Sequence, residues 1–391
     1  MPNLWLWSLL VTYLSFTLLT IITFYAKIYN MDIIKIYDNS NKLYYIGGVV
    51  RDKLLGVESF DVDITFEGNA IEHCSQFGEI IQENPDFGTV RVLVNNKEVD
   101  FASTRSEIYP QKGHLPVVSK IGCSLKEDVM RRDFTVNALA MRVSDGEIID
   151  YVNGQEDLKN KLLRVLHNES FIDDPTRIIR GLKFRVRFDF DLEENTRKLQ
   201  EKYLENINYD MSFKRVKKEL METFNLNSQR AFELFVNEGI YKLVSPIKFE
   251  LPNVNIEELL RKYPVDNIWL VYVGLLPDLS NIELTKTERN IIDDARQIGE
   301  LNSDFEIYKA FDGLAIESVL LYGITHNLGT AKRYLDDLRH IKISVSGENL
   351  LTLGIQPSPK YQEIFDNILK SKLQNPNMTK EDELNLVKKL F

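Results

Sequence analysis

The chain from residue 42 to about 165 alternates between two hydrophobic patterns. Short runs of β-branched and aromatic residues, bounded by Gly, Asn, Asp or Pro, indicate strands, whereas apolar residues three or four positions apart indicate helices. The two patterns together predict an α+β head. The predicted strands cover residues 43–50, 60–66, 89–95, 97–103 and 146–152. The predicted helices cover residues 50–56, 69–78 and 125–142.

The pattern changes after residue 173, where the strand signal fades and apolar residues recur at helical spacing. This half of the chain is therefore predicted to be all-helical. Proline residues interrupt it and suggest boundaries near residues 250 and 345. The predicted organisation is a head at 42–165, a neck at 166–250, and a helical body and tail at 251–391.

The first 30 residues follow a third pattern. Residues 1–26 contain no Asp, Glu, Lys or Arg, and residues 4–24 are apolar or aromatic with interspersed Ser and Thr. About 20 such residues can span a bilayer as a helix. Two interpretations follow. The segment is a transmembrane anchor that tethers a cytoplasmic protein to the inner face of the membrane, or it is a wrongly assigned gene start, because a soluble sequence begins at Met31.

Composition narrows the classes of function. With 48 Lys and Arg against 58 Asp and Glu, the net charge of −10 disfavours coating of nucleic acid by overall charge, so any RNA contact must be a local patch. Two cysteines are too few for a disulfide framework or a Cys-rich metal site, and they suggest a reducing compartment.

A glycine pair at the end of a predicted strand marks a candidate phosphate and metal site. Gly47 and Gly48 allow backbone amides to approach a phosphate at a helix N-terminus, and Arg51 can add a charge-assisted bond to a triphosphate. Asp61 and Asp63 follow, two apart on one face of an extended strand. Paired carboxylates on one face predict a Mg²⁺ site of the kind that serves in-line displacement.

A third carboxylate is expected from a neighbouring strand. Glu98 and Asp100 lie on one face of the predicted strand 97–103, and either could complete the metal site, with a slight preference for Asp100. The structural alternative is that one of them forms a salt bridge with Arg91 or Arg105.

Four motifs stand in the order seen in bacterial class II tRNA nucleotidyltransferases and their poly(A) polymerase relatives, which the chain resembles over about residues 42–220. The resemblance implies a polymerase-β-like nucleotidyltransferase head with a mixed sheet, followed by an all-α neck, body and tail. The motifs are Gly47-Gly48-x-Val50-Arg51-Asp52, Asp61-x-Asp63, Arg131-Arg132-Asp133-Phe134-Thr135-Val136-Asn137-Ala138 and Asp173-Asp174-Pro175-Thr176-Arg177-Ile178-Ile179-Arg180.

The third motif is predicted to lie late in a helix that begins near Leu125. Arg132 and Asn137 can then share one helix face. By resemblance to the family, these two residues contact the sugar and phosphates of the incoming nucleotide, and Asp133 positions them. An Arg–Asp pair on a solvated helix face is the structural alternative.

The fourth motif is expected to select the base without a nucleic-acid template. Asp174 and Arg177, three apart on a predicted helix, offer an acceptor and a planar donor fork that can imitate a complementary base. Cytosine and adenine carry the matching exocyclic amine, which uracil and guanine lack. Arg180 is expected to support this pair or a phosphate. The family usually has Glu where this chain has Asp173. The stretch 109–118 corresponds to a loop that in this family influences the addition of adenine.

Two basic clusters are candidates for holding the RNA acceptor through its phosphates. Solvated helix faces are the alternative for both. The first cluster contains Lys183, Arg185 and Arg187, and the second contains Lys214, Arg215, Lys217 and Lys218.

Together these features predict an enzyme that adds C, C and A to the 3′ end of tRNA from CTP and ATP, with Mg²⁺ and release of pyrophosphate. An enzyme that adds only A or only CC, and a poly(A) polymerase, remain as alternatives, because the motifs are shared by all four. A non-catalytic RNA-binding protein is the alternative from another class. No protein partner is evident from the sequence.

Overall fold

The computed structural model describes residues 38, 40–59 and 62–390. The chain divides into two compact units, one up to Arg215 and one from Val216 onward, so the division falls inside the predicted neck. The apolar segment 1–30 lies outside the described residues. Within the described part, no helix is long and apolar enough to cross a membrane.

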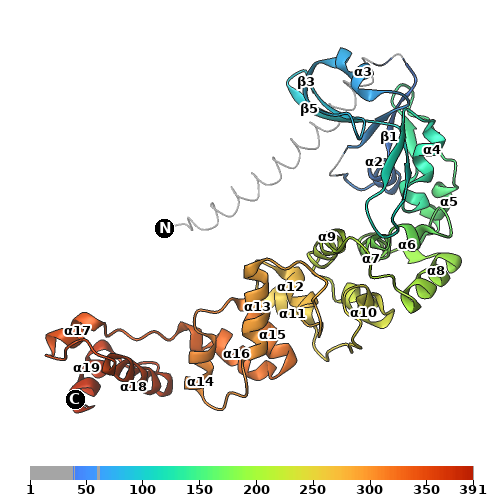
Figure 1. The fold of residues 1–391 in the computed structure, drawn as a ribbon. Coiled ribbons are helices and arrows are strands. Elements are labelled where there is room, and N and C mark those ends of the chain that lie inside the picture. The colour runs from blue at the N-terminus through green and yellow to red at the C-terminus, as the bar shows by residue number, and fades with distance from the viewer. Residues whose placement is uncertain (1–37, 39, 60–61, 391) are drawn as a thin grey trace, which may run out of the picture. The chain divides into compact units, whose positions relative to one another are not determined.

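A seven-stranded sheet is the centre of the first unit (Figure 1). Its strand order is β3-β4-β5-β2-β1-β8-β9, and all neighbours are antiparallel except β2 and β5, which are parallel. The predicted mixed sheet is thus confirmed. The strands are β1 (Leu43–Ile46), β2 (Ile64–Phe66), β3 (Glu79–Asn84), β4 (Thr89–Val94), β5 (Lys97–Ser103), β8 (Ala140–Arg142) and β9 (Ile148–Ile149).

Short helices pack on this sheet. Helix α2 (Gly48–Leu55) directly follows β1, and α3 (Ala70–Cys74) and η1 (Ser75–Phe77) connect β2 to β3. Helix α4 (Leu125–Met130) begins with a capping box between Ser124 and Glu127. Its apolar face packs against Tyr44 and Ile46 of β1 in a buried cluster. This packing places the residues that follow α4 beside the end of β1.

The turn between β4 and β5 sets the register of these two strands. Asn95 and Asn96 both have positive φ, +49° and +63°, as a two-residue type I′ hairpin turn requires. Val94 then pairs with Lys97, and Arg91 pairs with Asp100. Because side chains alternate along β5, Val99 and Phe101 are buried while Glu98 and Asp100 are exposed on the other face.

Several elements differ from those predicted. The strand β8 lies inside the segment 125–142 that was predicted to be one helix, and η2 (Thr135–Asn137) separates it from α4. A hairpin of β6 (Arg105–Ile108) and β7 (Val117–Ile121) flanks the predicted loop 109–118. After residue 173 the chain is not purely helical, since β11 (Asp191–Leu192) pairs in parallel with β10 (Leu162–Leu163).

Helices complete the first unit after the sheet. Helix α7 is amphipathic, and it ends at Asp189, which has a left-handed backbone conformation. The division between the two units falls inside α9. The helices are α5 (Gly154–Lys159), α6 (Ser170–Asp173), α7 (Thr176–Phe188), α8 (Glu194–Glu205) and the start of α9 (Phe213–Phe224).

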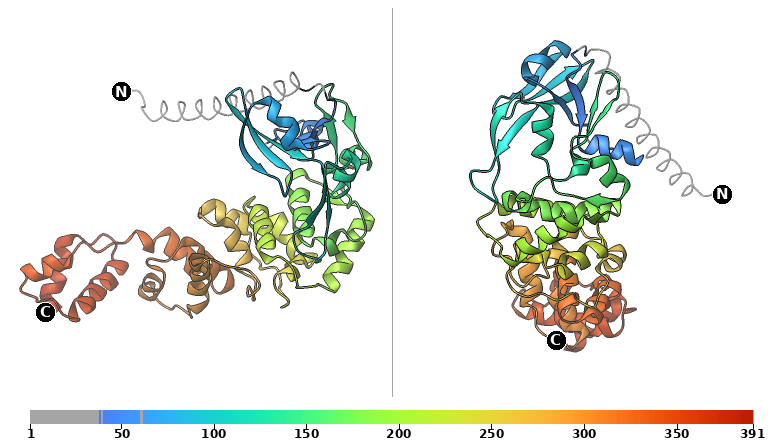
Figure 2. Two further views of the ribbon diagram at one scale, coloured as in Figure 1. Left: turned by 45° about the horizontal axis from the view of Figure 1, so that its top comes forward. Right: turned by 90° about the vertical axis from the view of Figure 1, so that its right-hand side faces the viewer.

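In the second unit, residues 216–390 form helices and loops with no strand, as Figure 2 shows. The C-terminal part has its own apolar core, which includes Leu350, Ile364 and Val387. The helices are α10 (Gln229–Asn237), η3 (Ile240–Leu243), α11 (Ile256–Lys262), α12 (Ile268–Val273), α13 (Lys286–Gln297), α14 (Asp304–Phe311), α15 (Ile316–Thr325), α16 (Leu328–Asp336), η4 (Leu338–His340), α17 (Gly347–Thr352), α18 (Lys360–Gln374) and α19 (Lys380–Leu390).

Candidate active site

The glycine turn before α2 makes room for an arginine. Gly47 has φ +74°, and a Cβ built on it would lie 2.8 Å from Nη1 of Arg132. The Arg132 side chain therefore packs directly on the backbone of the turn, close to the N-terminus of α2. Its Nη2 donates to Asp128, 3.2 Å away, and its buried Nε makes no hydrogen bond within the described residues. This leaves a cationic donor group beside a helix N-terminus.

Arg132 also lines a cavity of about 450 Å³ on the sheet. Asp63 and Asp100 line the same cavity, together with Arg91 and Arg131. Both carboxylates are exposed to solvent. The cavity therefore combines carboxylates that can bind a cation with guanidinium groups that can bind a phosphate.

The parallel pairing of β2 and β5 brings the two carboxylates to neighbouring positions. Ile64 pairs with Phe101, and Asp63 and Asp100 each stand one residue earlier on their strands. Hard oxygen donors on adjacent strands match the preference of Mg²⁺. No three His, Cys, Asp or Glu side chains of the described residues come close enough together to hold a metal ion, and the third predicted ligand, Asp61, lies outside that part.

Both candidates for the additional carboxylate form ion pairs with Arg91. Asp100 accepts from Nε and Nη2 of Arg91 at 2.7 and 3.0 Å, and Glu98 lies 3.5 Å from Nη1. The structural alternative thus holds for both residues through Arg91, whereas Arg105 pairs with Glu107 instead. Asp100 lines the cavity and directly precedes Phe101, where the pairing of β5 with β2 begins. Glu98 lies two residues before Asp100 and does not line the cavity. The geometry therefore favours Asp100 over Glu98.

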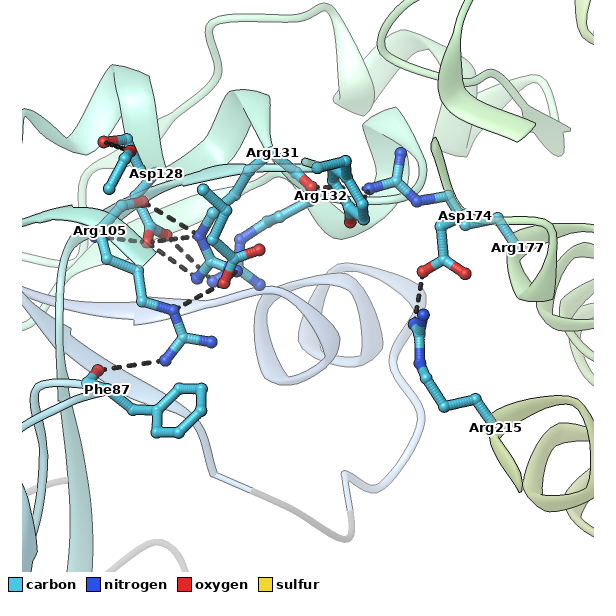
Figure 3. A network of polar contacts seen from close by, with 12 residues as sticks. Phe87, Arg105, Asp128, Arg131, Arg132, Asp174, Arg177 and Arg215 are labelled. Atoms are coloured by element: carbon cyan, nitrogen blue, oxygen red, sulfur yellow. Dashed lines mark hydrogen bonds and ion pairs between the residues drawn. The ribbon is translucent and has the colours of Figure 1, made fainter. Parts of the chain in front are cut away.

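The third motif is not helical throughout, so the prediction of one helix from Leu125 is wrong. Helix α4 ends at Met130, and the chain turns before η2. The buried carboxylate of Asp128 holds this turn: it accepts from Arg131 Nη2 at 2.9 Å and from the backbone N–H of Arg105 at 3.0 Å (Figure 3). Burial would raise the pKa of Asp128, but the charges of Arg132 and Arg131 outweigh this and lower it.

A second network joins the third motif to α7. Asn137 accepts from Nη1 of Arg51 and donates to Asp133 at 3.0 Å, and Asp133 accepts from Nε of Arg180 at 2.8 Å. Burial raises the pKa of Asp133, but Arg180 and the Asn137 hydrogen bond outweigh this and lower it to about 2. The predicted positioning role of Asp133 is consistent with this geometry. Arg51, predicted at the triphosphate, is itself buried and also donates to Asp52.

The fourth motif also differs from the prediction, because Asp174 and Arg177 do not lie on one helix. Asp174 has an extended backbone and precedes Pro175, and α7 begins at Thr176. A residue before proline is disfavoured in the helical region. Oδ1 of Asp174 accepts from the backbone N–H and the hydroxyl of Thr176. Its Oδ2 accepts from Arg215, as Figure 3 shows.

Arg177 is buried and well ordered by its contacts. Its guanidinium donates to the Ser170 hydroxyl at 2.7 Å, to the Arg131 carbonyl at 2.9 Å and to the Tyr109 hydroxyl at 3.2 Å. It lines a second cavity of about 410 Å³ together with Tyr109, His167 and Asp173. Arg131 lines both cavities. Arg132 and Arg177 therefore line two neighbouring cavities rather than a single one, and Asp174 lines neither.

The loop between β6 and β7 contacts the fourth motif directly. Lys112 forms an ion pair with Asp173, and the N–H of Gly113 donates to the Asp173 carbonyl at 3.0 Å. His114 and Gln111 both contact Asp210. Asp173, where the family usually has Glu, thus has a basic partner on the loop 109–118.

Comparisons with known proteins agree with this geometry. The poly A polymerase head domain family matches residues 43–164. The A-adding tRNA nucleotidyltransferase of Halalkalibacterium halodurans is 27% identical over 383 residues, which are 89% of this chain and 88% of that protein. The Thermotoga maritima CCA-adding enzyme complexed with tRNA is similar in structure, with a TM-score of 0.72, 26% identity, and coverage of 89% of this chain and 91% of that chain. The chain is thus similar to the bacterial class II CCA-adding enzyme family along most of its length.

One relative in this family is much longer. The A-adding tRNA nucleotidyltransferase of Geobacter sulfurreducens is 31% identical over 398 residues, which are 89% of this chain and 45% of that protein. The chain therefore spans less than half the length of that relative.

The predicted RNA-binding residues differ in exposure. Lys183 and Arg185 are buried, and Arg185 lies 3.2 Å from Asp191, so these two do not lie on a solvated helix face. Lys217 is held by Glu288 at 2.6 Å. The exposed residues of the two clusters are Arg187, Lys214 and Lys218, and Arg215 binds Asp174.

Three residues that organise the candidate site were not predicted from the sequence. Asp128 had a usable signal, since it stands three and four residues before Arg131 and Arg132 at helical ion-pair spacing. Tyr109 and Glu107 gave no such signal. Tyr109 contacts Arg177, 68 residues away, and Glu107 contacts Arg131, 24 residues away.

Proposed function

We propose that the protein is a tRNA nucleotidyltransferase that extends the RNA 3′ end with nucleotides from CTP and ATP. The 3′-hydroxyl oxygen of the RNA attacks the α-phosphorus of the nucleoside triphosphate, the hydroxyl proton is lost, and pyrophosphate leaves. The observation that carries the proposal is the shared cavity of Asp63, Asp100 and Arg132, next to the cavity of Arg177. Carboxylates that could bind a metal, arginines that could bind phosphate and the proposed base-reading Arg177 line adjoining cavities, which supports the proposal.

The carboxylates supply the expected metal site. Asp63 and Asp100, with Asp61, would hold Mg²⁺, which when bound lowers the pKa of the attacking hydroxyl and neutralises the leaving pyrophosphate. Asp100 must exchange its contact with Arg91 for the cation. Because that contact is exposed to solvent, its loss costs little. Arg91 would remain beside the cavity as a counter-charge for phosphate.

Arginine side chains hold the triphosphate. Arg132 offers donors that its single bond to Asp128 leaves available, and its place on Gly47 fixes it close to the start of α2. The helix N-terminus adds backbone N–H groups that favour an anion. Asn137, fixed by Arg51 and Asp133, presents an amide beside the same turn.

Selection of cytosine and adenine is assigned to Asp174 and Arg177. A guanidinium has five N–H donors, and only part of this capacity is used by the contacts of Arg177 to Ser170, Tyr109 and Arg131. Through Oδ2, the Asp174 carboxylate would accept from the exocyclic amine that cytosine and adenine share, in exchange for the contact with Arg215. A site built around that amine rejects bases without it by a large factor.

Addition of all three nucleotides C, C and A is the primary candidate, in line with the sequence prediction. Addition of A alone is the second candidate, and a specific observation favours it. Two relatives that align with 89% of this chain, those of Geobacter sulfurreducens and Halalkalibacterium halodurans, are A-adding tRNA nucleotidyltransferases.

The deciding experiment uses the full chain with Mg²⁺ and three tRNA substrates, which end before CCA, before the terminal A, or after the complete CCA. Each is incubated with CTP, ATP or both, and products are resolved at single-nucleotide length. Three additions that then stop support CCA addition. One A on tRNA ending in CC, with no extension of tRNA that ends before CCA, supports A addition. Extension by CC alone or by long A tails identifies the other two enzymes, and no extension of any substrate refutes the proposal.

A further inference from the structure

An aromatic pair on α7 lies beneath the arginines of the nucleotide site. Arg180, Phe184 and Phe188 are spaced four apart, so they share one face of this helix. The Cζ of Arg51 lies 4.3 Å from the ring centroid of Phe188 and 5.3 Å from that of Phe184. The Cζ of Arg180 lies 5.5 Å from the Phe184 centroid. One aromatic surface thus contacts both guanidinium groups.

These contacts close a ring of interactions around Asn137. Arg51 donates to Asn137, Asn137 donates to Asp133, and Asp133 accepts from Arg180. Arg51 and Arg180 are the two ends of this chain of hydrogen bonds. Arg51 lies over the Phe184 and Phe188 rings, and Arg180 lies over the Phe184 ring. The head contributes Arg51, Asp133 and Asn137, and α7 contributes the rest.

Each of the three guanidinium nitrogens of Arg51 donates one hydrogen bond, and the ring contact adds a restraint on the face of the group. Its Nε and Nη2 donate to Asp52 at 2.8 and 2.6 Å, and its Nη1 donates to Asn137. These hydrogen bonds lie in the guanidinium plane and leave its face accessible, and an aromatic ring that packs on this face attracts the charge. Burial lowers the pKa of Arg51, with Asp52 opposing this. The face of the Phe188 ring therefore stabilises the Arg51 guanidinium, which burial has separated from most of its water.

We propose that Phe188, assisted by Phe184, is a positioning residue that holds Arg51 and thereby Asn137 in the orientation that binds the incoming nucleoside triphosphate. This inference rests on the proposed function for the identity of the ligand. Phe188 acts through Arg51 and does not itself touch substrate. The quadrupole of its ring, more than its volume, is the property that matters.

The test replaces Phe188 in the full chain and measures ATP binding at equilibrium, together with KM and kcat on tRNA ending in CC. Phe188→Leu keeps an apolar side chain but removes the ring, so the Kd and KM for ATP are expected to rise roughly 5- to 30-fold. The kcat and the KM for tRNA stay within about twofold of the parent values. Phe188→Tyr, which keeps the ring, is expected to restore ATP affinity.

Phe190→Leu is the matched control. The Phe190 ring is more deeply buried and packs 5.7 Å from the Phe188 ring, but Arg51 lies over Phe188 and Phe184. Loss of Phe190 is therefore expected to cost more stability and less ATP affinity than loss of Phe188. Thermal unfolding of every variant verifies folding, and Phe188→Met replaces the leucine variant if that one does not fold.

Three results would overturn the inference. In the first, Phe188→Leu or Phe188→Met binds ATP as tightly as the parent. In the second, Phe188→Tyr binds ATP as weakly as Phe188→Leu. In the third, Phe190→Leu loses as much ATP affinity as Phe188→Leu. Failure of the proposed function has a different signature. A parent chain that binds ATP but does not extend tRNA refutes the transfer reaction, while the Kd comparison among variants still decides the role of Phe188.

Discussion

Replacing Gly47 with alanine separates backbone strain from the position of Arg132. Gly47 has φ +74° and ψ −125°, a conformation that side chains other than that of glycine strongly disfavour. The new Cβ would lie 2.8 Å from Nη1 of Arg132 and 3.5 Å from the carbonyl oxygen of Asn137. The Arg132 guanidinium must therefore shift by several tenths of an ångström to reach an ordinary van der Waals distance from the new Cβ.

Two effects of different size are expected from Gly47→Ala. The strained backbone costs about 1–3 kcal/mol of unfolding free energy, or roughly 2–4 °C in unfolding midpoint per kcal/mol for a unit of this size. Displacement of Arg132 weakens a charge-assisted contact with the triphosphate, worth about 1.5–3 kcal/mol. The kcat/KM for ATP is then expected to fall about tenfold or more.

Gly56→Ala is the control, because Gly56 ends the same helix with φ +68° and has nothing within 4 Å of a built Cβ. Gly56→Ala is expected to introduce backbone strain of about 1–2 kcal/mol without a steric contact like that between the Gly47→Ala Cβ and Arg132. Thermal unfolding and steady-state kinetics on tRNA measure both variants. The control should lose stability and keep the kcat/KM for ATP. If Gly47→Ala also keeps the control's kcat/KM for ATP, the reasoning that the turn positions Arg132 is refuted.

Three further predictions concern single side chains. Asp63→Ala should abolish nucleotide incorporation while the unfolding midpoint stays within about 1 °C, because the side chain is exposed; wild-type incorporation would remove the metal assignment. Burial and the charge of Arg177 lower the pKa of His167, so near and below the ordinary histidine pKa the unfolded chain binds more protons than the folded chain. The unfolding free energy should therefore fall from pH 8 to pH 5.5, and it should fall by less in His167→Gln. Denaturant titrations that give the same pH dependence of unfolding free energy for both proteins would contradict this. Glu383→Gln leaves the buried Lys372 ammonium without its carboxylate and should cost about 3–5 kcal/mol without changing ATP Kd; an unchanged denaturation midpoint would count against it.

The sequence predicted the sheet well where strands are half-buried. Residues 89–94 and 97–103 alternate apolar and polar positions, and both form strands. Strand β3 was missed because all of its residues are exposed, so no apolar alternation identifies it. Residues 140–142 were assigned to a helix because their apolar pattern continued that of α4. Only the pairing with β1, almost 100 residues earlier in the chain, shows them to be a strand.

The predicted geometry of the candidate site was wrong in one respect that the sequence could have revealed. Motif spacing predicted Asp63, Arg132 and Arg177, which line two neighbouring cavities, but it placed Asp174 on a helix although Pro175 follows it. The proline was a local signal against that helix. Lys183 and Arg185 were expected on the surface because charge usually lies there, and a contact such as that between Arg185 and Asp191 depends on tertiary packing.

The two-residue turn at Asn95 and Asn96 limits how this active site can evolve. Asp100 faces Asp63 only while the hairpin keeps its register, and a one-residue insertion or deletion in the turn would send every side chain of β5 to the opposite face. Val99 and Phe101 would then be exposed, and Asp100 would enter the core. Length changes at this turn are thus tolerable only in steps of two residues, or with a compensating bulge in β5 before Asp100.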